Sequence, residues 1–508
     1  MPDHTPHARS LAFLAVALAT AASAAQAGGA PPRSTVTAPF PDDHRTLATT
    51  ITFADMAAFL GSVDGKGPVN VSVEGTSVTG RSLYLVHLGR GDRPTWRILF
   101  YAQQHGNEVS GKDALLYLIR DIARDPTLLP RDVDLWIMPM VNPDGAEADT
   151  RKNAAGADLN RDHMTLEQPE TQALYRVVQR LRPHLAVDCH EFTRDGDERR
   201  ARGLIAWPDI TMDGLNNPLF DRGVIEAAQR WVDEAVEAEA RGGHPFLRYS
   251  VGGLPPDEEQ RHSAPDLDGG LNGIGAYGGL SFIIEAAVMR SAGPPLNDLG
   301  SRVDAYLVLL RRFISCDRHR RGDLAAIARE RSKPLPAFLP VNYLWVNPRN
   351  IVTDFPVREL AGGGTLRVPT ANLMTEMVVK RSVPTPLGYA VEPRAAQEFA
   401  ALLARHAIPF ETVAAPRSVT AESCTLLRVE EEFDEVYSRY EGRQIVTRGP
   451  AGAWELPAGG LWVPLSGEAA LRASLLLEPA AMYGLYQYPR YRALVASGGI
   501  VPVVRVVR

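Results

Sequence analysis

The segment QQHGNE (residues 103–108) places an imidazole and a carboxylate, His105 and Glu108, three positions apart directly after the apolar run WRILFYA. On a turn, side chains at positions i and i+3 can face one point, which suits two ligands of one ion. His190 follows another apolar run, LAVDC, and offers a second imidazole. Two imidazoles and one carboxylate leave the fourth position of a zinc ion open for water, as in catalytic sites. The sequence therefore predicts a zinc site made by these three residues.

A different zinc motif, H-E-x-x-H, can be tested on His190 and Glu191. Its second histidine would fall at Arg194, so this motif is absent here. A single histidine at a strand end is also typical of a hydrogen-bonded surface group. The zinc prediction therefore depends on other polar residues that could reach the same point.

Several further motifs supply such residues. NPDG (142–145) follows the apolar run LWIMPM, RKN (151–153) and DLNR (158–161) come next, and a later strand, SFIIEAA, carries Glu285. Together with HGNE and the D-x-H at 188–190, and in this order, they resemble the zinc carboxypeptidases of the carboxypeptidase A type. The resemblance covers roughly residues 45–320. It implies one Zn²⁺ per catalytic domain, held by His105, Glu108 and His190.

The resemblance also implies roles for the surrounding residues. Asp158 would accept a hydrogen bond from His105 and orient it. Arg151 would polarise the scissile carbonyl and stabilise the oxyanion, and Asn160 with Arg161 would hold the terminal carboxylate of the substrate, which the planar guanidinium can meet bidentately. Glu285 would be the general base that takes a proton from a zinc-activated water. A carboxylate between apolar neighbours is costly to bury without a purpose, which favours this role.

One feature of the family is missing. A mobile tyrosine some twenty residues before the catalytic glutamate closes over the substrate in that family, whereas Tyr277 stands only eight residues before Glu285. We expect Tyr277 to pack in the interior, although the sequence leaves open whether it replaces the missing tyrosine. Side-chain preference should be set near Leu271 and Asn272.

The predicted elements alternate between short apolar strands and amphipathic helices. Strands are expected at 96–102, 133–141, 185–189, 204–207 and 280–286, and helices at 108–123, 169–181, 224–239 and 299–315. This alternation favours an α/β fold. Near-continuous apolar strands such as ILFYA predict a central sheet, mixed and flanked by helices on both faces as in carboxypeptidase A.

The chain has 508 residues, which suggests more than one domain. Residues 1–27 read as a signal peptide, because an apolar stretch from residue 11 to 24 precedes an A-x-A cleavage pattern ending at Ala27. A flexible leader (28–48), a catalytic domain (49–325) and a smaller C-terminal α/β or α+β domain of unknown role (335–508) are expected to follow. The mature protein would be secreted or periplasmic, without a stable membrane span.

Composition excludes some classes of function. Hydrophobic residues make up 45% and charged residues 22%, the usual globular balance, with a net charge of -6 and no dense basic block, so a nucleic-acid partner is not expected. Three widely spaced cysteines (Cys189, Cys316, Cys424) do not form a disulfide framework, although one bridge is possible.

The sequence thus favours a metallocarboxypeptidase acting on peptides or acyl-amino acids that carry a free carboxylate. A zinc-dependent deacylase or amidase acting on acyl-amino acids or cell-wall peptides is the alternative, since the substrate loop is Gly-rich and lacks the usual tyrosine. An inactive, zinc-containing peptide-binding module is the third interpretation, which the presence of both Glu285 and Arg151 disfavours.

Overall fold

The structure is a computed structural model that describes residues 36–90, 95–239, 243–289, 298–315, 318–331, 333–434 and 439–507. The predicted signal peptide, the first residues of the predicted leader (28–35) and Cys316 lie outside the described residues. Cys189 and Cys424 are both buried free thiols.

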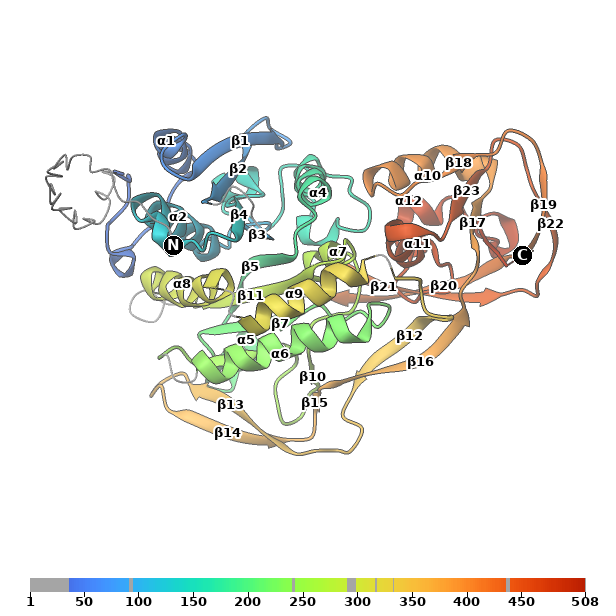
Figure 1. Cartoon of the computed structure of the whole chain (residues 1–508). Helices are drawn as coiled ribbons and strands as arrows, with labels where there is room; N and C mark the ends of the chain where they lie inside the picture. Colours follow the sequence, from blue (N-terminus) through green and yellow to red (C-terminus); the bar gives the residue numbers. More distant parts are fainter. Residues whose placement is uncertain are drawn as a thin grey trace, which may run out of the picture.

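A mixed eight-stranded sheet forms the centre of the first part of the chain (Figure 1). Its strands β4, β3, β5 and β11 are parallel, while β1, β2 and β7 run antiparallel to a neighbour and β8 is parallel to β7. In spatial order the strands are β1 (Val69–Thr76), β2 (Ser82–Gly89), β4 (Val133–Met138), β3 (Trp96–Ala102), β5 (Leu185–Thr193), β11 (Leu280–Val288), β7 (Ile210–Gly214) and β8 (Phe246–Arg248). The predicted mixed sheet is confirmed.

Helices cover both faces of this sheet. Alternate residues of a strand point to opposite faces, so each central strand contributes side chains to two cores. Ile98 and Phe100 of β3 belong to the core cluster formed with one set of helices, whereas Leu99 and Tyr101 belong to the core on the other face. The first set comprises α1 (Phe53–Val63), α2 (Ser110–Arg124), α6 (Arg222–Glu239), α8 (Leu299–Ser315) and α9 (Arg318–Glu330), and the second comprises α4 (Pro169–Leu181) and α7 (Gly270–Gly275). Burial of β3, β5 and β11 on both faces explains their almost uninterrupted apolar sequences.

Short elements complete this part of the chain. They are α3 (Pro143–Glu147), α5 (Asp197–Ala201), η1 (His44–Thr46), η2 (Pro126–Leu128), η3 (Leu159–Arg161), β6 (Leu204–Ala206), β9 (Val251–Gly252) and β10 (Gln260–Arg261). Strand β6 was expected in the central sheet, but it pairs instead with β13, which lies far along the chain.

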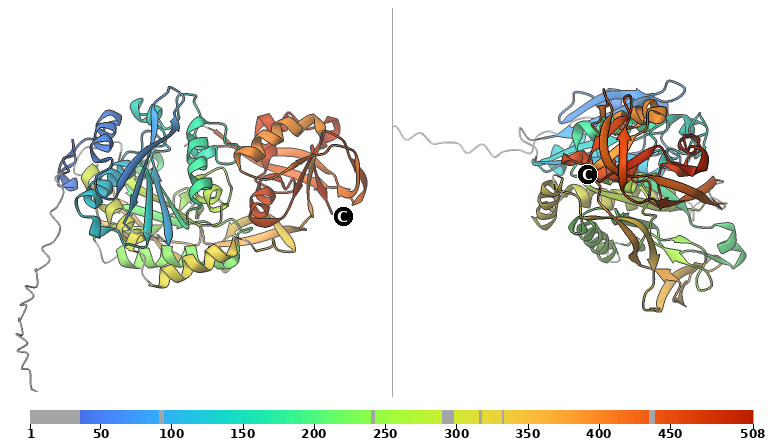
Figure 2. Two further views of the ribbon diagram at one scale, coloured as in Figure 1. Left: turned by 45° about the horizontal axis from the view of Figure 1, so that its top comes forward. Right: turned by 90° about the vertical axis from the view of Figure 1, so that its right-hand side faces the viewer.

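The C-terminal part has its own core and its own antiparallel six-stranded sheet (Figure 2). This sheet consists of β18 (Glu411–Thr412), β23 (Leu461–Pro464), β17 (Gly388–Val391), β24 (Val503–Val506), β19 (Arg417–Glu422) and β22 (Gly452–Leu456). With it go a hairpin of β20 (Cys424–Asp434) and β21 (Arg439–Arg448), and α10 (Pro393–Arg405), α11 (Ala470–Leu477), α12 (Pro489–Arg492), η4 (Gly467–Ala469), η5 (Leu485–Gln487) and η6 (Ser497–Gly499). An antiparallel sheet with separate helices is α+β, one of the two classes expected.

Five strands connect the two parts. They are β12 (Phe338–Val346), β13 (Thr353–Glu359), β14 (Thr365–Thr370), β15 (Leu373–Met374) and β16 (Glu376–Pro384). β12 and β16 pair with each other, while β13 pairs with β6 and β15 with β10. The segment between β12 and β16 thus returns to the first part of the chain.

Candidate active site

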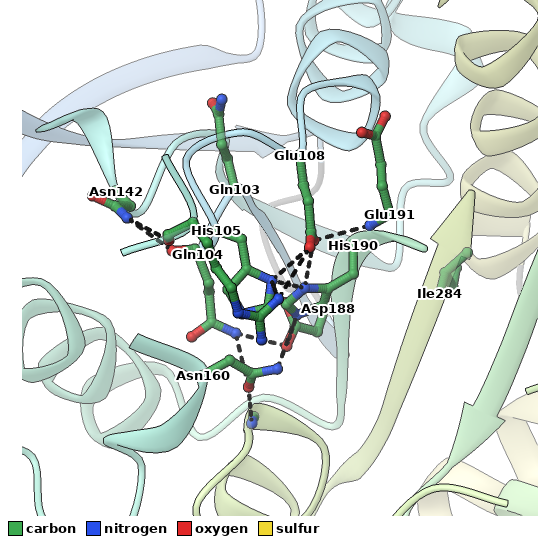
Figure 3. A network of polar contacts seen from close by, with 12 residues as sticks. Gln103, Gln104, His105, Glu108, Asn142, Asn160, Asp188, His190, Glu191 and Ile284 are labelled. Atoms are coloured by element: carbon green, nitrogen blue, oxygen red, sulfur yellow. Dashed lines mark hydrogen bonds and ion pairs between the residues drawn. The ribbon is translucent and has the colours of Figure 1, made fainter. Parts of the chain in front are cut away.

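Three side chains predicted to bind a metal ion, His105, Glu108 and His190, meet at one point (Figure 3). Nδ1 of His105 lies 2.8 Å from Oε1 of Glu108, and Nδ1 of His190 lies 2.9 Å from Oε2 of the same carboxylate. The two Nδ1 atoms are 3.0 Å apart. Within the described residues, this is the group of histidine, cysteine or acidic side chains with the spacing of a metal site.

Local backbone geometry produces this convergence. Strand β3 ends at Ala102, and Gln103 adopts a positive φ of 58°, which turns the chain sharply before His105. Gly106 then lies against the backbone of Gly145, where an added Cβ would stand 2.0 Å from the carbonyl carbon. A glycine is therefore required for the close approach of these two loops. His190 lies within β5, which continues to Thr193 and not only to residue 189 as expected.

Each ligand histidine has a carboxylate behind it. Nε2 of His105 lies 3.2 Å from Oδ1 of Asp158, and Nε2 of His190 lies 2.9 Å from Oδ2 of Asp188. A carboxylate that accepts the Nε2 proton leaves the Nδ1 lone pair for a cation and makes the imidazole a stronger ligand. The sequence reasoning did not assign this role to Asp188, although residues two apart on a strand share a face.

The ligand set fits zinc. His105, Glu108 and His190 are 3%, 6% and 2% exposed, and they offer two imidazole nitrogens and one carboxylate. Burial alone would raise the pKa of Glu108, but the two imidazoles outweigh it and hold this pKa well below its usual range. The carboxylate is therefore ionised, as a cation ligand must be.

Glu285 lies on β11 directly opposite His190 of β5 and lines the same cavity as His105 and Glu108. Its side chain is 9% exposed. Burial raises the pKa of Glu285 to about 7, and this effect is opposed mainly by the neighbouring His190. A carboxylate whose pKa is close to neutrality can both accept and return a proton.

Arg151 reaches the metal-binding group from the loop after α3. Its Nε donates to Oδ2 of Asp158 over 2.9 Å, and its Nη1 lies 3.4 Å from Oε1 of Glu108. Asp158 thus contacts both His105 and Arg151. Burial would raise the pKa of Asp158, but His105 and Arg151 together hold it well below its usual range, so the carboxylate stays charged between its two partners.

Asn160 and Arg161 lie on η3, at the wall of the same cavity. Oδ1 of Asn160 accepts the backbone N–H of Gly270 over 2.8 Å, which ties η3 to the first residue of α7. Nε of Arg161 lies 3.9 Å from Oδ1 of Asp268, in the loop before α7. The structure thus brings the two residues expected to hold a carboxylate to one side of the metal-binding group.

The cavity has a volume of about 850 Å³ and includes both residues expected to influence side-chain preference, Leu271 and Asn272. Tyr277 does not line it. Tyr277 is 8% exposed, its hydroxyl lies 3.1 Å from Nδ1 of His406, and the guanidinium of Arg472 covers its ring at 4.6 Å. Tyr277 therefore packs between the two parts of the chain, as expected. A different residue, Tyr249, is the tyrosine at the cavity wall.

The chain is similar in part to known carboxypeptidases. Residues 56–194 match the model of the Peptidase_M14 family, described as zinc carboxypeptidase. The chain is similar to probable carboxypeptidase 2 of Trichophyton verrucosum, with 30% identity over 136 residues that make up 26% of each chain. It is also similar to carboxypeptidase D of Rattus norvegicus, with 30% identity over 255 residues, or 40% of this chain and 17% of that protein.

Among solved structures, a metallo-carboxypeptidase from Pseudomonas aeruginosa in complex with (2-guanidinoethylmercapto)succinic acid aligns over 53% of this chain and 68% of that chain, with 25% identity and a TM-score of 0.41. The chain spans about a quarter of the length of the first curated relative. The family match confirms the resemblance predicted from the motifs over residues 56–194, which include the three metal-binding candidates and Arg151, Asn160 and Arg161. Glu285 lies beyond the matched segment.

Proposed function

We propose that this chain is a zinc-dependent metallocarboxypeptidase that removes C-terminal residues from peptides, and the match of residues 56–194 to the zinc carboxypeptidase family supports this proposal. The observation that carries the proposal is the meeting of His105, Glu108 and His190 beside Glu285 in one cavity. His105 and Glu108 follow β3, and His190 and Glu285 lie in the carboxyl-terminal halves of β5 and β11, toward the edge of the sheet where α/β folds place their sites. The substrate would be a peptide with a free C-terminal carboxylate.

The surrounding residues would bind the substrate, stabilise the oxyanion and orient the ligand imidazoles. Asn160 and Arg161 would hold the terminal carboxylate of the substrate, for which a guanidinium is suited by its paired donors. Arg151, fixed by Asp158, would donate to the oxyanion that develops on the scissile carbonyl. Asp158 and Asp188 would hold the two ligand imidazoles in the tautomer that presents Nδ1.

A zinc ion held by the three ligands would lower the pKa of a bound water toward about 7 and polarise the scissile carbonyl. Glu285 would take a proton from the attacking water and return it to the leaving amine, for which a pKa of about 7 is well placed. Burial of Glu285 therefore serves the reaction, because an ordinary exposed carboxylate is too weak a base.

A pair of substrates tests the proposal. A blocked dipeptide with a free C-terminal carboxylate should be hydrolysed by the zinc-loaded protein, whereas its C-terminal amide should not. Removal of metal by a chelator should abolish turnover, and added Zn²⁺ should restore it. Turnover of the amide but not of the free acid would instead support the amidase alternative, which the family match does not favour.

Glu285→Gln separates catalysis from peptide binding. The variant should retain zinc and lose turnover, whereas Glu259→Gln, an exposed glutamate at the wall of the same cavity, should keep both. Equal activity of the two variants would exclude Glu285 as the general base. Retained zinc with no turnover in the wild-type protein would favour an inactive peptide-binding module.

We also infer export from the cell, on the signal-peptide pattern that ends near Ala27. None of the helices in the described residues has the length and hydropathy needed to cross a bilayer. Fractionation of cells that express the full chain, with N-terminal sequencing of the product, tests this point. A cytoplasmic product that retains its first residues would contradict it.

A further inference from the structure

The segment between β12 and β16 returns to the candidate active site and extends two of its walls. We name residues 353–374 the arm, comprising β13, β14 and β15 (Figure 1, lower part). β13 pairs antiparallel with β6, and β15 pairs parallel with β10. Residues of both β6 and β10 line the cavity of the metal-binding group. The arm is therefore joined by strand pairing to the segments that form this cavity.

One face of β13 is turned toward the cavity. Phe355 and Val357 stand two positions apart, so they share a face of the strand, and both line the cavity. Val357 lies opposite Ala206 of β6, which also lines it. The next residue, Trp207, is held by the arm, since its indole N–H donates to the hydroxyl of Thr365 on β14 over 3.1 Å. Phe355, Val357 and Trp207 form what we call the apolar wall.

Asn160 and Arg161, which we call the carboxylate-holding residues, are connected to β11 on the amino-terminal side of Glu285. Before Glu285, Ile283 lies opposite Asp213 of β7, and the carboxylate of Asp213 accepts the backbone N–H of Ser263 over 3.1 Å. The loop that begins at Ser263 leads to Gly270, which is bonded to Asn160. Asn160 and Arg161 are therefore connected to the part of β11 that precedes Glu285.

The apolar wall is connected to the opposite end of β11. After Glu285, Ala286 lies opposite Ile210, the first residue of β7. Trp207 precedes Ile210 by three residues, so the apolar wall lies beyond the end of β11. Glu285 thus stands between the carboxylate-holding residues and the apolar wall. A peptide held by its C-terminal carboxylate and cleaved at Glu285 would extend its preceding residues toward this wall.

From this arrangement we propose that the arm supplies the subsite for the residues that precede the cleaved bond, and that its apolar wall selects an aromatic or aliphatic side chain there. The inference rests on the proposed carboxypeptidase function and adds a substrate class to it. Burial of such a side chain should strengthen binding about tenfold or more. The arm, which follows the central sheet in the sequence, would then be part of the substrate site.

Peptides that differ only before the cleaved bond test the inference. The C-terminal residue is fixed at the one the wild-type protein prefers, and Gly or Phe is placed in turn at each of the two preceding positions. The wild-type protein should favour Phe at one of these positions by about tenfold in kcat/KM. Phe355→Ala should reduce this preference to within about twofold, because kcat/KM should fall more on the Phe peptide than on the Gly peptide.

Two further variants distinguish recognition from a structural effect. Phe355→Leu keeps an apolar side chain and should retain most of the preference. Val379→Ala, on an exposed side chain of β16 outside the cavity, should leave it unchanged. An unchanged preference in Phe355→Ala, or an equal loss on the Gly and Phe peptides, would overturn the inference and leave the carboxypeptidase function standing. Absence of turnover on every peptide by the zinc-loaded wild-type protein would overturn both.

Discussion

Replacement of Asp188 by asparagine should weaken zinc binding without unfolding the protein. Asp188 is fully buried, and its Oδ2 accepts from Nε2 of His190 over 2.9 Å and from Nε2 of Gln104 over 2.7 Å. Asparagine has nearly the same shape, and its amide oxygen can accept both hydrogen bonds, but it loses the negative charge behind His190. The tautomer of His190 that presents Nδ1 would lose part of its support, and the imidazole would become a weaker ligand.

The loss of zinc affinity in Asp188→Asn follows from the charge that is removed. Hydrogen bonds to charged groups contribute about 1.5–3 kcal/mol, and loss of a carboxylate behind a ligand histidine typically costs ~10–100-fold in metal affinity. We expect the Kd for zinc to rise ~10–100-fold in Asp188→Asn, which corresponds to about 1.4–2.7 kcal/mol. Competition with a chromophoric zinc chelator measures this constant directly.

Asp162→Asn is a matched control. Asp162 is also a buried carboxylate, but it accepts from Thr165, Thr171 and the backbone N–H groups of residues 167 and 168, away from the metal-binding group. This variant should lower the melting temperature and leave the zinc Kd of the folded protein unchanged. A Kd for Asp188→Asn within twofold of the wild-type value, in protein whose metal-free form melts normally, would refute the reasoning.

Three other predictions follow from the site and its surroundings. Arg151→Ala should reduce kcat by ~10²–10³, since an oxyanion donor is lost, while zinc content measured by elemental analysis stays near one per chain; a parallel loss of metal and activity would contradict the assignment. Gly106→Ala should destabilise the protein by about 1–3 kcal/mol in urea unfolding, because its Cβ would meet the backbone of Gly145, whereas Gly61→Ala on α1, with open space around it, should not; similar stability of the two variants would show that the loops do not approach so closely. Burial lowers the pKa of His406 to about 3, against about 6.5 in the unfolded chain, so its contribution to stability is complete above about pH 6.5 and is lost as the pH falls. Between pH 7 and pH 5 the unfolding free energy of the wild-type protein should therefore fall by about 2 kcal/mol more than that of His406→Gln, and equal pH dependence of the two would argue against a buried neutral imidazole.

The ligand set could be predicted from the sequence because it depends on short-range patterns. His105 and Glu108 follow a strand of largely apolar residues, and His190 follows a second apolar run, LAVDC, although β5 continues beyond it. Parallel neighbours in a sheet bring such positions to one edge, and the motifs that follow, NPDG, RKN and DLNR, supported a common site for the three residues. Helices with strong amphipathic patterns, α4 and α8, were predicted to the residue for the same reason.

Other features depend on contacts between distant segments. Strand β6 looks like any short apolar strand, and only its pairing with β13, some 150 residues later, shows that it lies outside the central sheet. Asp188 was visible as part of a D-x-H pattern, but its role requires knowing that Nε2 of His190 points back into the sheet. Domain boundaries drawn from composition near residues 325–335 stay a prediction, and they do not show that the arm returns to the cavity.

Anomalous diffraction at the zinc absorption edge, from crystals of the zinc-loaded protein, tests the central claim most directly. One strong peak per chain is expected, about 2.0–2.2 Å from Nδ1 of His105, Nδ1 of His190 and a carboxylate oxygen of Glu108, with the Glu285 side chain beside the open coordination position. A peak elsewhere, or no peak in protein that elemental analysis shows to contain zinc, would contradict it.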